Sequence, residues 1–367
     1  MIGIICFWDR IATPYLAKYE KMLQEQGLDY EVVFWNRTCS SETASEDRNA
    51  IYINLECAGS KIRKVFSFLR WKEKAEKVIR ERKYDHLIVL STVPAVLLYF
   101  TLAGKYRKKY IFDIRDYTFE KNRIFKAVVM SLVRGSCLTP ISSKGYLRWL
   151  GASENIIVNH NITIEEQPLK PCSDPEKSVY NIGFVGNVRL DSQTRALLLA
   201  LKDNEQFEQH FYGRILPGCD IEELKQNYGI KNLHLSGPFT VDDKVKIYEK
   251  IDIINCVYAN AVQEEKIPLG DSTPLPNRLY DAITFYRPIV ASKGTYLAEL
   301  VQEYHLGCCI NGFDQRAPEE ILQYLRNYDM DRFMDGCDRL RRLVVEEETV
   351  FRKRCRDVFR EWELQGD

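Results

Sequence analysis

The stretch 270–300 holds the residues whose types and spacing are best suited to chemistry: GDSTPLPNRLYDAITFYRPIVASKGTYLAEL. Prolines bracket the loop 273–276, a short helix is predicted over 277–286, and the apolar strand 289–292 leads to a helix that begins at Gly294. In a parallel α/β sheet, ligands bind outside the carboxyl ends of the strands, where helix N-termini offer N–H groups to an anion. Two such N-termini predict a phosphorylated or nucleotide-linked ligand. The alternative is that these prolines and glycines only punctuate an α/β fold.

Further candidates follow other predicted strands. The strand 109–113 ends at Asp113-Ile114-Arg115-Asp116, which puts two carboxylates and a guanidinium at a carboxyl edge. A structural ion pair is the competing interpretation of this group. Gly186 follows the strand 180–185, and a glycine there lets the backbone approach a ligand closely. Three arginines also stand beside predicted strand ends or helix starts: Arg189, Arg195 and Arg214.

The composition limits the class of protein. Because 52 Lys and Arg residues balance 52 Asp and Glu residues, no global positive field attracts nucleic acid. Eleven cysteines are scattered without a CxxC pair, which argues against a zinc site or a disulfide framework. Such scattered cysteines are typical of a protein in the reducing cytosol. The N-terminus has no basic region typical of a signal peptide, and the apolar runs are too short to span a membrane. We therefore expect a soluble or membrane-surface protein.

Predicted strands and helices alternate along most of the chain, as in an α/β fold. A length of 367 residues is enough for two domains with separate cores. Periodicity is lost and prolines gather between 163 and 178, as is typical of an interdomain linker. The predicted organisation is a first domain over 1–165, a linker over 166–178, a second domain over 179–343 and a terminal amphipathic helix over 344–367. No GxGxxG motif follows the first strand, so dinucleotide binding is not predicted there.

The segment 61–83 is strongly basic, with ten Lys or Arg residues against three Glu. Apolar and aromatic residues are interleaved with these charges. Anionic bilayers attract such segments by about 1 kcal/mol for each basic residue near the surface. The segment predicts contact with an anionic membrane or an anionic acceptor; the alternative is a solvated helix face packed on a sheet. A late Asp329-Met330-Asp331 has the form of a metal motif, but its helical surroundings favour a helix cap.

A series of short motifs carries a family resemblance over about 130 residues. The motifs, in chain order, are Phe184-Val185-Gly186, Tyr212-Gly213-Arg214, Leu235-Ser236-Gly237-Pro238, Asp252-Ile253-Ile254-Asn255, and 276–282 continuing through 288–292. Their order and separations resemble the donor-binding half of GT-B glycosyltransferases, most closely the retaining family 4 enzymes. The resemblance implies an α/β fold of two Rossmann-like domains facing a cleft, with a C-terminal helix that returns to the first domain. The first domain, which matches only loosely, would contribute the acceptor side.

The resemblance also implies roles, and the sequence departs from the family at some of them. The E-x7-E element of the family maps to Thr273 and Asp281, so the first carboxylate is absent. Asn187 stands where the family has an arginine, so another cation must stabilise the departing diphosphate. The candidates for that cation are Arg189, Arg195, Arg214 and Arg278, with Arg189 and Arg214 ranked first. The resemblance implies no metal and no cofactor, with the nucleotide sugar as substrate.

The resulting hypothesis is transfer of a sugar from a nucleotide-diphosphate donor to a glycan or lipid-linked acceptor in surface polysaccharide assembly. Diphosphate would be held by Arg189 and Arg214 and by the helix N-termini at Pro274 to Asn277 and near Gly294. Asp281 would hold ribose, and Asp116 or Arg115 would face the reacting sugar or acceptor. We expect a cytoplasmic location, peripheral at the inner face of the plasma membrane. His160 is a further residue that could line the cleft.

Two alternatives belong to other classes. The absent carboxylate at Thr273 motivates a catalytically weak GT-B subunit that stabilises a partner transferase. The other is a GT-B epimerase acting on a nucleotide sugar, which would form free epimer without an acceptor.

Overall fold

The computed structural model describes residues 1–10, 12–37, 39, 48–161, 177–260 and 267–364. The chain divides into two compact units. Unit 1 comprises Met1–Asn161 and Glu346–Asp367, and unit 2 comprises Ile162–Val345. The predicted linker 166–178 lies outside the described residues except for its last two positions.

Unit 1 is built on a parallel sheet. Its strands are β1 (Ile2–Cys6), β2 (Tyr30–Asn36), β3 (Ala50–Asn54), β4 (His86–Leu90), β5 (Tyr110–Asp113), β6 (Thr139–Ile141) and β7 (Ile156–Val158). The first five pair in the order β3-β2-β1-β4-β5. Two isolated parallel bridges, Ile111 with Leu138 and Ile114 with Ile141, connect this sheet to the segment of β6. This is the order of a Rossmann sheet, and the order reverses between β1 and β4.

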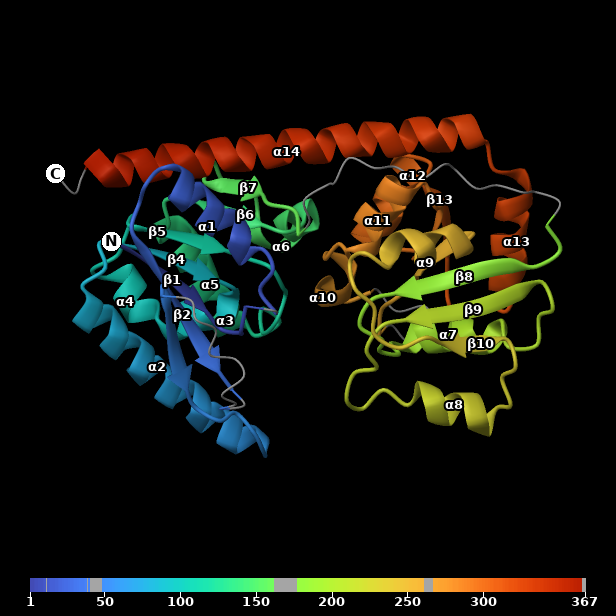
Figure 1. The fold of residues 1–367 in the computed structure, drawn as a ribbon, viewed down its shortest axis with the longest axis horizontal. Coiled ribbons are helices and arrows are strands. Elements are labelled where there is room, and N and C mark those ends of the chain that lie inside the picture. Colours follow the sequence, from blue (N-terminus) through green and yellow to red (C-terminus); the bar gives the residue numbers. More distant parts are fainter. Residues whose placement is uncertain (11, 38, 40–47, 162–176, 261–266, 365–367) are drawn as a thin grey trace. The chain divides into compact units, whose positions relative to one another are not determined.

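Helices cover both faces of this sheet. They are α1 (Leu16–Glu25), α2 (Lys61–Arg82), α3 (Thr92–Leu97), α4 (Tyr99–Ala103), α5 (Arg123–Gly135) and α6 (Leu147–Leu150). One face packs against α1 and the last part of α14 (Met330–Leu364), whose Phe351, Phe359 and Trp362 are buried in the same core as Ile4 and Val32. Figure 1 shows α1 and α14 on one side of these strands and α2 on the other.

Unit 2 repeats the same strand order. Its strands are β8 (Tyr180–Val185), β9 (Phe207–Tyr212), β10 (Leu233–Leu235), β11 (Ile253–Cys256), β12 (Ile289–Ser292) and β13 (Gly307–Ile310). They form a parallel sheet in the order β10-β9-β8-β11-β12-β13. The order reverses between β8 and β11, so the crevice that binds ligands in such sheets is expected at the carboxyl ends of these two strands.

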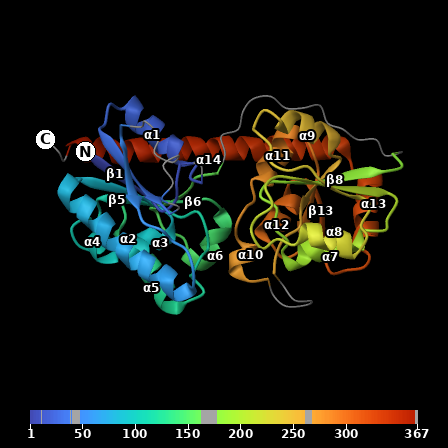
Figure 2. The ribbon, with the colours of Figure 1, turned by 60° about the horizontal axis from the view of Figure 1, so that its bottom comes forward.

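The helices of unit 2 also lie on both faces of the sheet. They are α7 (Ser192–Ala200), α8 (Ile221–Asn227), α9 (Lys244–Lys250), α10 (Leu269–Ser272), α11 (Arg278–Phe285), α12 (Tyr296–Glu303) and α13 (Ala317–Asn327). One core joins α9, α11, α12 and the first half of α14 to alternate residues of β11 and β12. The opposite face packs on α7, α8 and α13. Figure 2 shows α9 and α11 on one side of β8 and α7 and α8 on the other.

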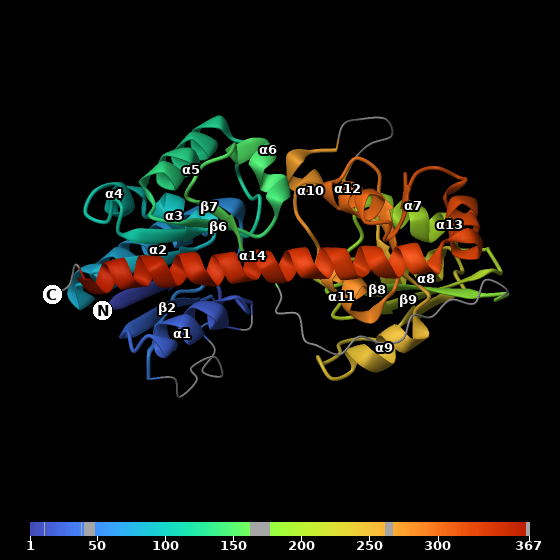
Figure 3. The same ribbon diagram turned by 90° about the horizontal axis from the view of Figure 1, so that it is seen from above.

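The terminal helix α14 has 35 residues and is uninterrupted, as Figure 3 shows. Asp329 precedes it, and the Asp329 carboxylate accepts a hydrogen bond of 3.0 Å from the backbone N–H of Arg332. The prediction that this acidic motif is a helix cap is therefore confirmed. The described residues contain no helix long and apolar enough to cross a membrane.

Candidate functional site

The strand ends in unit 2 are held together by backbone contacts. Gly186, which follows β8, has φ of +139° and donates its N–H to the carbonyl oxygen of Tyr212 at 2.9 Å. Gly213, which follows β9, has φ of +138°. A Cβ atom on Gly213 would lie 1.8 Å from the carbonyl oxygen of Gly186, so only glycine fits at this position. The two loops are thus pressed backbone to backbone at the carboxyl edge of the sheet.

Beyond the glycines, the two loops stay paired. The N–H of Val188 donates to the carbonyl oxygen of Arg214 at 2.8 Å, and the N–H of Leu216 donates to that of Val188 at 3.0 Å. Asn187, Arg189 and Arg214 are exposed on these loops. The nearest carboxylate oxygen to Arg189 is that of Asp191, 3.5 Å from Nε. Because the backbone is fixed and the side chains are exposed, these groups can reach a ligand without rearranging the fold.

Arg278 lies where the strand order reverses. Its guanidinium carbon is 3.8 Å from the ring centroid of Phe184 in β8, and its Nη1 donates to the carbonyl oxygen of Asn255 in β11. A cation stacked on an aromatic face and hydrogen-bonded to the backbone keeps its orientation. The structure therefore holds one fixed positive charge at the carboxyl ends of β8 and β11. Sequence reasoning named Arg278 but missed its partner Phe184, which the spacing gave no means to predict.

Asp281, predicted to hold ribose, is buried in the first turn of α11. Its carboxylate accepts hydrogen bonds of 2.7 Å from Lys244 Nζ and from the Tyr248 hydroxyl. Burial and the adjacent Asp281 carboxylate raise the pKa of Tyr248 well above its ordinary value, so Tyr248 remains a donor. Sequence reasoning missed Lys244, although Lys244 and Tyr248 are four residues apart on one helix face. The ribose role stays a prediction, and a ribose hydroxyl would have to share this carboxylate with two donors.

The loop before α11 is fixed by its own contacts. The side chain of Thr273 is fully buried, and its hydroxyl donates to the carbonyl oxygen of Leu269 at 2.5 Å. The hydroxyl of Tyr258 donates to the carbonyl oxygen of Pro274 at 3.2 Å. Asn277 is exposed at the N-terminus of α11. In this arrangement the Thr273 hydroxyl and the Thr273 N–H are both already bonded to the carbonyl oxygen of Leu269. Arg195 is paired with Asp220 on the neighbouring loop, which leaves it the least available of the four cations.

In unit 1, Arg115 is part of a buried network. Its Nη2 donates to Asp113 at 2.6 Å, and its Nη1 donates to the carbonyl oxygen of Asn159 at 3.0 Å and to Asn161 at 2.8 Å. Burial disfavours the charge of Arg115, but the Asp113 carboxylate outweighs it, so the pKa of the guanidinium lies above its ordinary value. Tyr19 also donates to Asp113. This geometry favours the structural ion pair that the sequence left open, whereas the neighbouring Asp116 is exposed.

A buried acid that sequence reasoning missed lies in the same loop. The carboxylate of Glu120 is almost inaccessible to solvent and accepts a hydrogen bond from the backbone N–H of Thr118. Burial raises the pKa of Glu120 above its ordinary value, although hydrogen bonds partly oppose this effect. His160 is also buried, and its Nε2 lies 2.8 Å from Glu347 of α14. His160 thus has a structural partner within unit 1.

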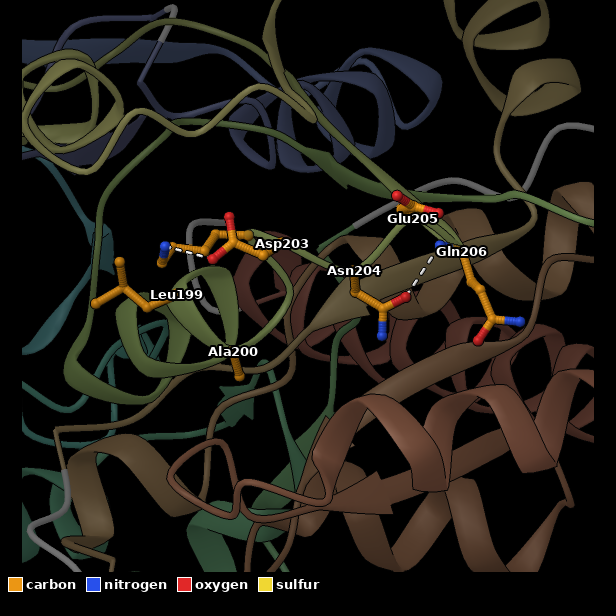
Figure 4. Close-up of a pocket in the computed structure, with 7 residues that line it drawn as sticks. Leu199, Ala200, Asp203, Asn204, Glu205 and Gln206 are labelled. Carbon is orange, nitrogen blue, oxygen red and sulfur yellow. Dashed lines mark hydrogen bonds and ion pairs between the residues drawn. The ribbon is translucent and has the colours of Figure 1, made fainter.

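One hollow in the surface of unit 2 lies away from the predicted site. The hollow of about 500 Å³ shown in Figure 4 is lined by residues 199, 200 and 202–206, between α7 and the amino end of β9. That is the edge of the sheet opposite to Gly186 and Gly213. The described residues contain no group of three or more His, Cys, Asp or Glu side chains arranged to hold a metal ion.

The comparisons with known proteins give the fold. No protein-family model and no curated protein matches the chain. The sucrose-phosphate synthase from Thermosynechococcus elongatus matches in structure with a TM-score of 0.72, over 98% of this chain and 100% of that chain, at 13% identity. HepE from Anabaena, solved in complex with UDP and glucose, matches with a TM-score of 0.64 over 96% of this chain and 98% of that chain, at 13% identity. The chain has the GT-B fold. The lipopolysaccharide outer core galactosyltransferase WaaB, in its apo form, matches with a TM-score of 0.63 over 98% of this chain and 99% of that chain, at 11% identity.

The GT-B fold confirms the fold class predicted from the sequence, including two Rossmann-like sheets. The C-terminal helix ends in the core of unit 1, as predicted, but it begins at Met330 and not at residue 344. At identities of 11% to 13%, these similarities establish the fold alone. Placement in the family 4 group, and the roles of individual site residues, stay predictions.

We predict that Gly213→Ala disrupts the carboxyl edge of unit 2. The added Cβ meets the Gly186 carbonyl oxygen in a backbone conformation with φ of +138°. Gly218→Ala is the matched control, because its φ is +86° but no atom lies within 4 Å of the added Cβ. Urea denaturation should show Gly213→Ala to be less stable than the control by about 1–3 kcal/mol. Equal stability of the two variants would contradict the contact.

We predict a pH-dependent gain in stability for Glu120→Gln. The pKa of Glu120 is raised in the folded chain, so the protonated carboxyl stabilises the folded state relative to the ionised one. This contribution to the free energy of unfolding is complete below the ordinary pKa of 4.5 and is lost as pH rises through the raised pKa. Glutamine keeps the acceptor oxygen without the buried charge. At pH 7 the thermal midpoint should rise by about 2 °C, and the difference should vanish near pH 4. Glu73→Gln, at an exposed position of α2, should change neither midpoint; a gain of Glu120→Gln at both pH values would refute the assignment.

Proposed function

We propose that the protein is a glycosyltransferase that moves a sugar from a nucleotide-diphosphate donor to a glycan or lipid-linked acceptor. The observation that carries the proposal is the structural match to glycosyltransferases over nearly the whole chain, together with a glycine-lined carboxyl edge bearing fixed and exposed cations in unit 2. HepE, which matches 96% of this chain, was solved with UDP and glucose bound. An anionic diphosphate is the part of such a donor that this edge suits best.

The arginines proposed to bind diphosphate differ in how many contacts fix their side chains. Arg278 is oriented by Phe184 and Asn255 and supplies positive charge before a ligand arrives. Arg189 and Arg214 are exposed and would close on the diphosphate from the loops after β8 and β9. Charge that is preorganised in this way stabilises the leaving diphosphate more than charge that must reorganise. The backbone at Gly186 and Asn187, with the loop from Thr273 to Asn277, would complete the donor site.

The finer features of the reaction belong to the same proposal. The transfer would retain the anomeric configuration and need no metal or other cofactor, since the cations above serve the leaving group. Asp116, exposed at the carboxyl edge of unit 1, would face the reacting sugar or acceptor, with Arg115 holding the loop that carries it. The acceptor would belong to assembly of a bacterial-type surface polysaccharide. We therefore expect the chain to act in the cytoplasm, at the inner face of the plasma membrane.

A second candidate function is a catalytically weak subunit that stabilises a partner transferase. The observation that favours it is Thr273, which replaces a family carboxylate and is buried with its hydroxyl bonded to Leu269. A chain of this kind could bind a nucleotide sugar without transferring it. Release of nucleoside diphosphate in the presence of acceptor glycans distinguishes the two functions, because only a transferase releases it in an acceptor-dependent way.

We predict that one of UDP, GDP, CDP or ADP, or its sugar, raises the thermal midpoint. A ligand at 100 times its dissociation constant adds about 2.7 kcal/mol to the stability of the state that binds it. This corresponds to a shift of roughly 5 °C for a domain of this size. Arg278→Ala and Arg214→Ala should each lose most of the shift at the same ligand concentration. Arg195→Ala, which removes an arginine paired with Asp220, should retain it. No shift with any of the four nucleotides or their sugars would contradict the donor site.

A further inference from the structure

The first half of α2 exposes a row of large apolar side chains. Ile62, Val65, Phe66 and Leu69 are 70%, 56%, 61% and 48% exposed. Their spacing of three, four and seven residues puts them on one face of the helix. A contiguous row of this kind on a soluble chain marks an interaction surface, whereas single exposed apolar residues do not.

This row is separate from the face by which α2 packs on unit 1. Trp71, Ala75 and Ile79 are buried against the sheet, and the rings of Trp71 and Trp35 lie 5.8 Å apart. At about 100° per residue, Trp71 lies about 180° around the helix from Ile62. The helix therefore has two apolar faces: one, from Trp71 onward, packs on the core of unit 1, and the other, the exposed row in the first half, does not.

Positive charge without a counter-charge gathers at the same half of the helix. No Asp or Glu occurs between residues 57 and 72. Among the described residues, Arg63, Lys64 and Arg70 form no ion pair, and all three are exposed. In the second half, three glutamates stand among the cations, and three of the cations are paired: Lys72 with Glu76, Lys77 with Glu81, and Arg82 with Glu31. The uncompensated charge thus coincides with the exposed apolar row.

We propose that the α2 docking surface, formed by Ile62, Val65, Phe66, Leu69 and the cations Arg63, Lys64 and Arg70, inserts shallowly into an anionic lipid bilayer. Helices that lie in a membrane interface bury an apolar face about 5–10 Å deep and place Lys and Arg against the headgroups. An anionic bilayer satisfies both features at once, since it offers hydrocarbon to the row and dispersed negative charge to the cations. The surface is narrower than the segment 61–83 that the sequence predicts, because the exposed apolar row ends at Leu69 and three glutamates offset part of the positive charge beyond it.

The α2 docking surface belongs to unit 1 and does not involve the donor edge of unit 2. Vesicle binding without nucleotide and nucleotide binding without vesicles therefore succeed or fail independently. The surface also implies a substrate class when combined with the proposed function, namely an acceptor that is itself anchored in the bilayer.

The test is co-sedimentation of the full chain with vesicles of phosphatidylcholine alone and of phosphatidylcholine mixed equally with phosphatidylglycerol. The wild-type chain should sediment with the mixed vesicles, and added salt should weaken the binding. The double change Phe66→Ser with Leu69→Ser should weaken partitioning about tenfold or more. The double change Arg63→Gln with Arg70→Gln should weaken it about 25-fold, which corresponds to about fivefold for each charge.

Two control variants test whether vesicle binding depends on the α2 docking surface or only on overall positive charge and exposed apolar residues elsewhere. Lys77→Gln with Arg82→Gln removes two cations that are already ion-paired, outside the α2 docking surface, and should change binding less than twofold. Val241→Ser removes an exposed apolar side chain of unit 2 and should have no effect. Absence of wild-type sedimentation, or equal losses in the control variants, would overturn the proposal. So would a change of molecular mass of Phe66→Ser with Leu69→Ser in lipid-free light scattering, since that result would assign the row to contact with a second copy.

Discussion

The parallel pairing of β8 with β9 on one side and β11 on the other is the constraint on which the candidate donor site depends. Parallel strands place all their carboxyl ends at one edge, and the order reverses between β8 and β11. Residues that are far apart in sequence, such as Gly186, Gly213 and Arg278, are brought to that edge by this pairing alone. The close contact of the two glycines then fixes the loops on which the exposed arginines stand.

The structure separates residues that position a site from residues that can meet a ligand. Arg278 in unit 2 and Arg115 in unit 1 are both held by several partners, but Arg278 stacks at the switch point of its sheet, whereas Arg115 is buried in an ion pair with Asp113. Asp281 is likewise engaged by Lys244 and Tyr248. The proposed chemistry therefore relies on fixed charge at Arg278 and on exposed charge at Arg189 and Arg214.

Much of the fold follows from the sequence because short apolar runs alternate with amphipathic helices. The strands predicted at 180–185 and 289–292 match the observed bounds. β3, α5 and α13 were not predicted, and the terminal helix predicted over 344–367 begins earlier, since α14 spans Met330–Leu364. Site residues next to turns were found through glycines and prolines. Their partners were not, because contacts such as Phe184 with Arg278 join positions whose proximity arises only from the sheet.

The central claim, that the carboxyl edge of unit 2 binds a nucleotide sugar, is tested most directly by hydrogen–deuterium exchange of the full chain. Exchange is compared with and without the nucleotide sugar that stabilises the protein. We expect slower exchange in the loops 186–189 and 213–216 and in the segment 273–278, with exchange in the turn 202–206 unchanged. Protection confined to 202–206 or to unit 1, or absent from all of these loops, would contradict it.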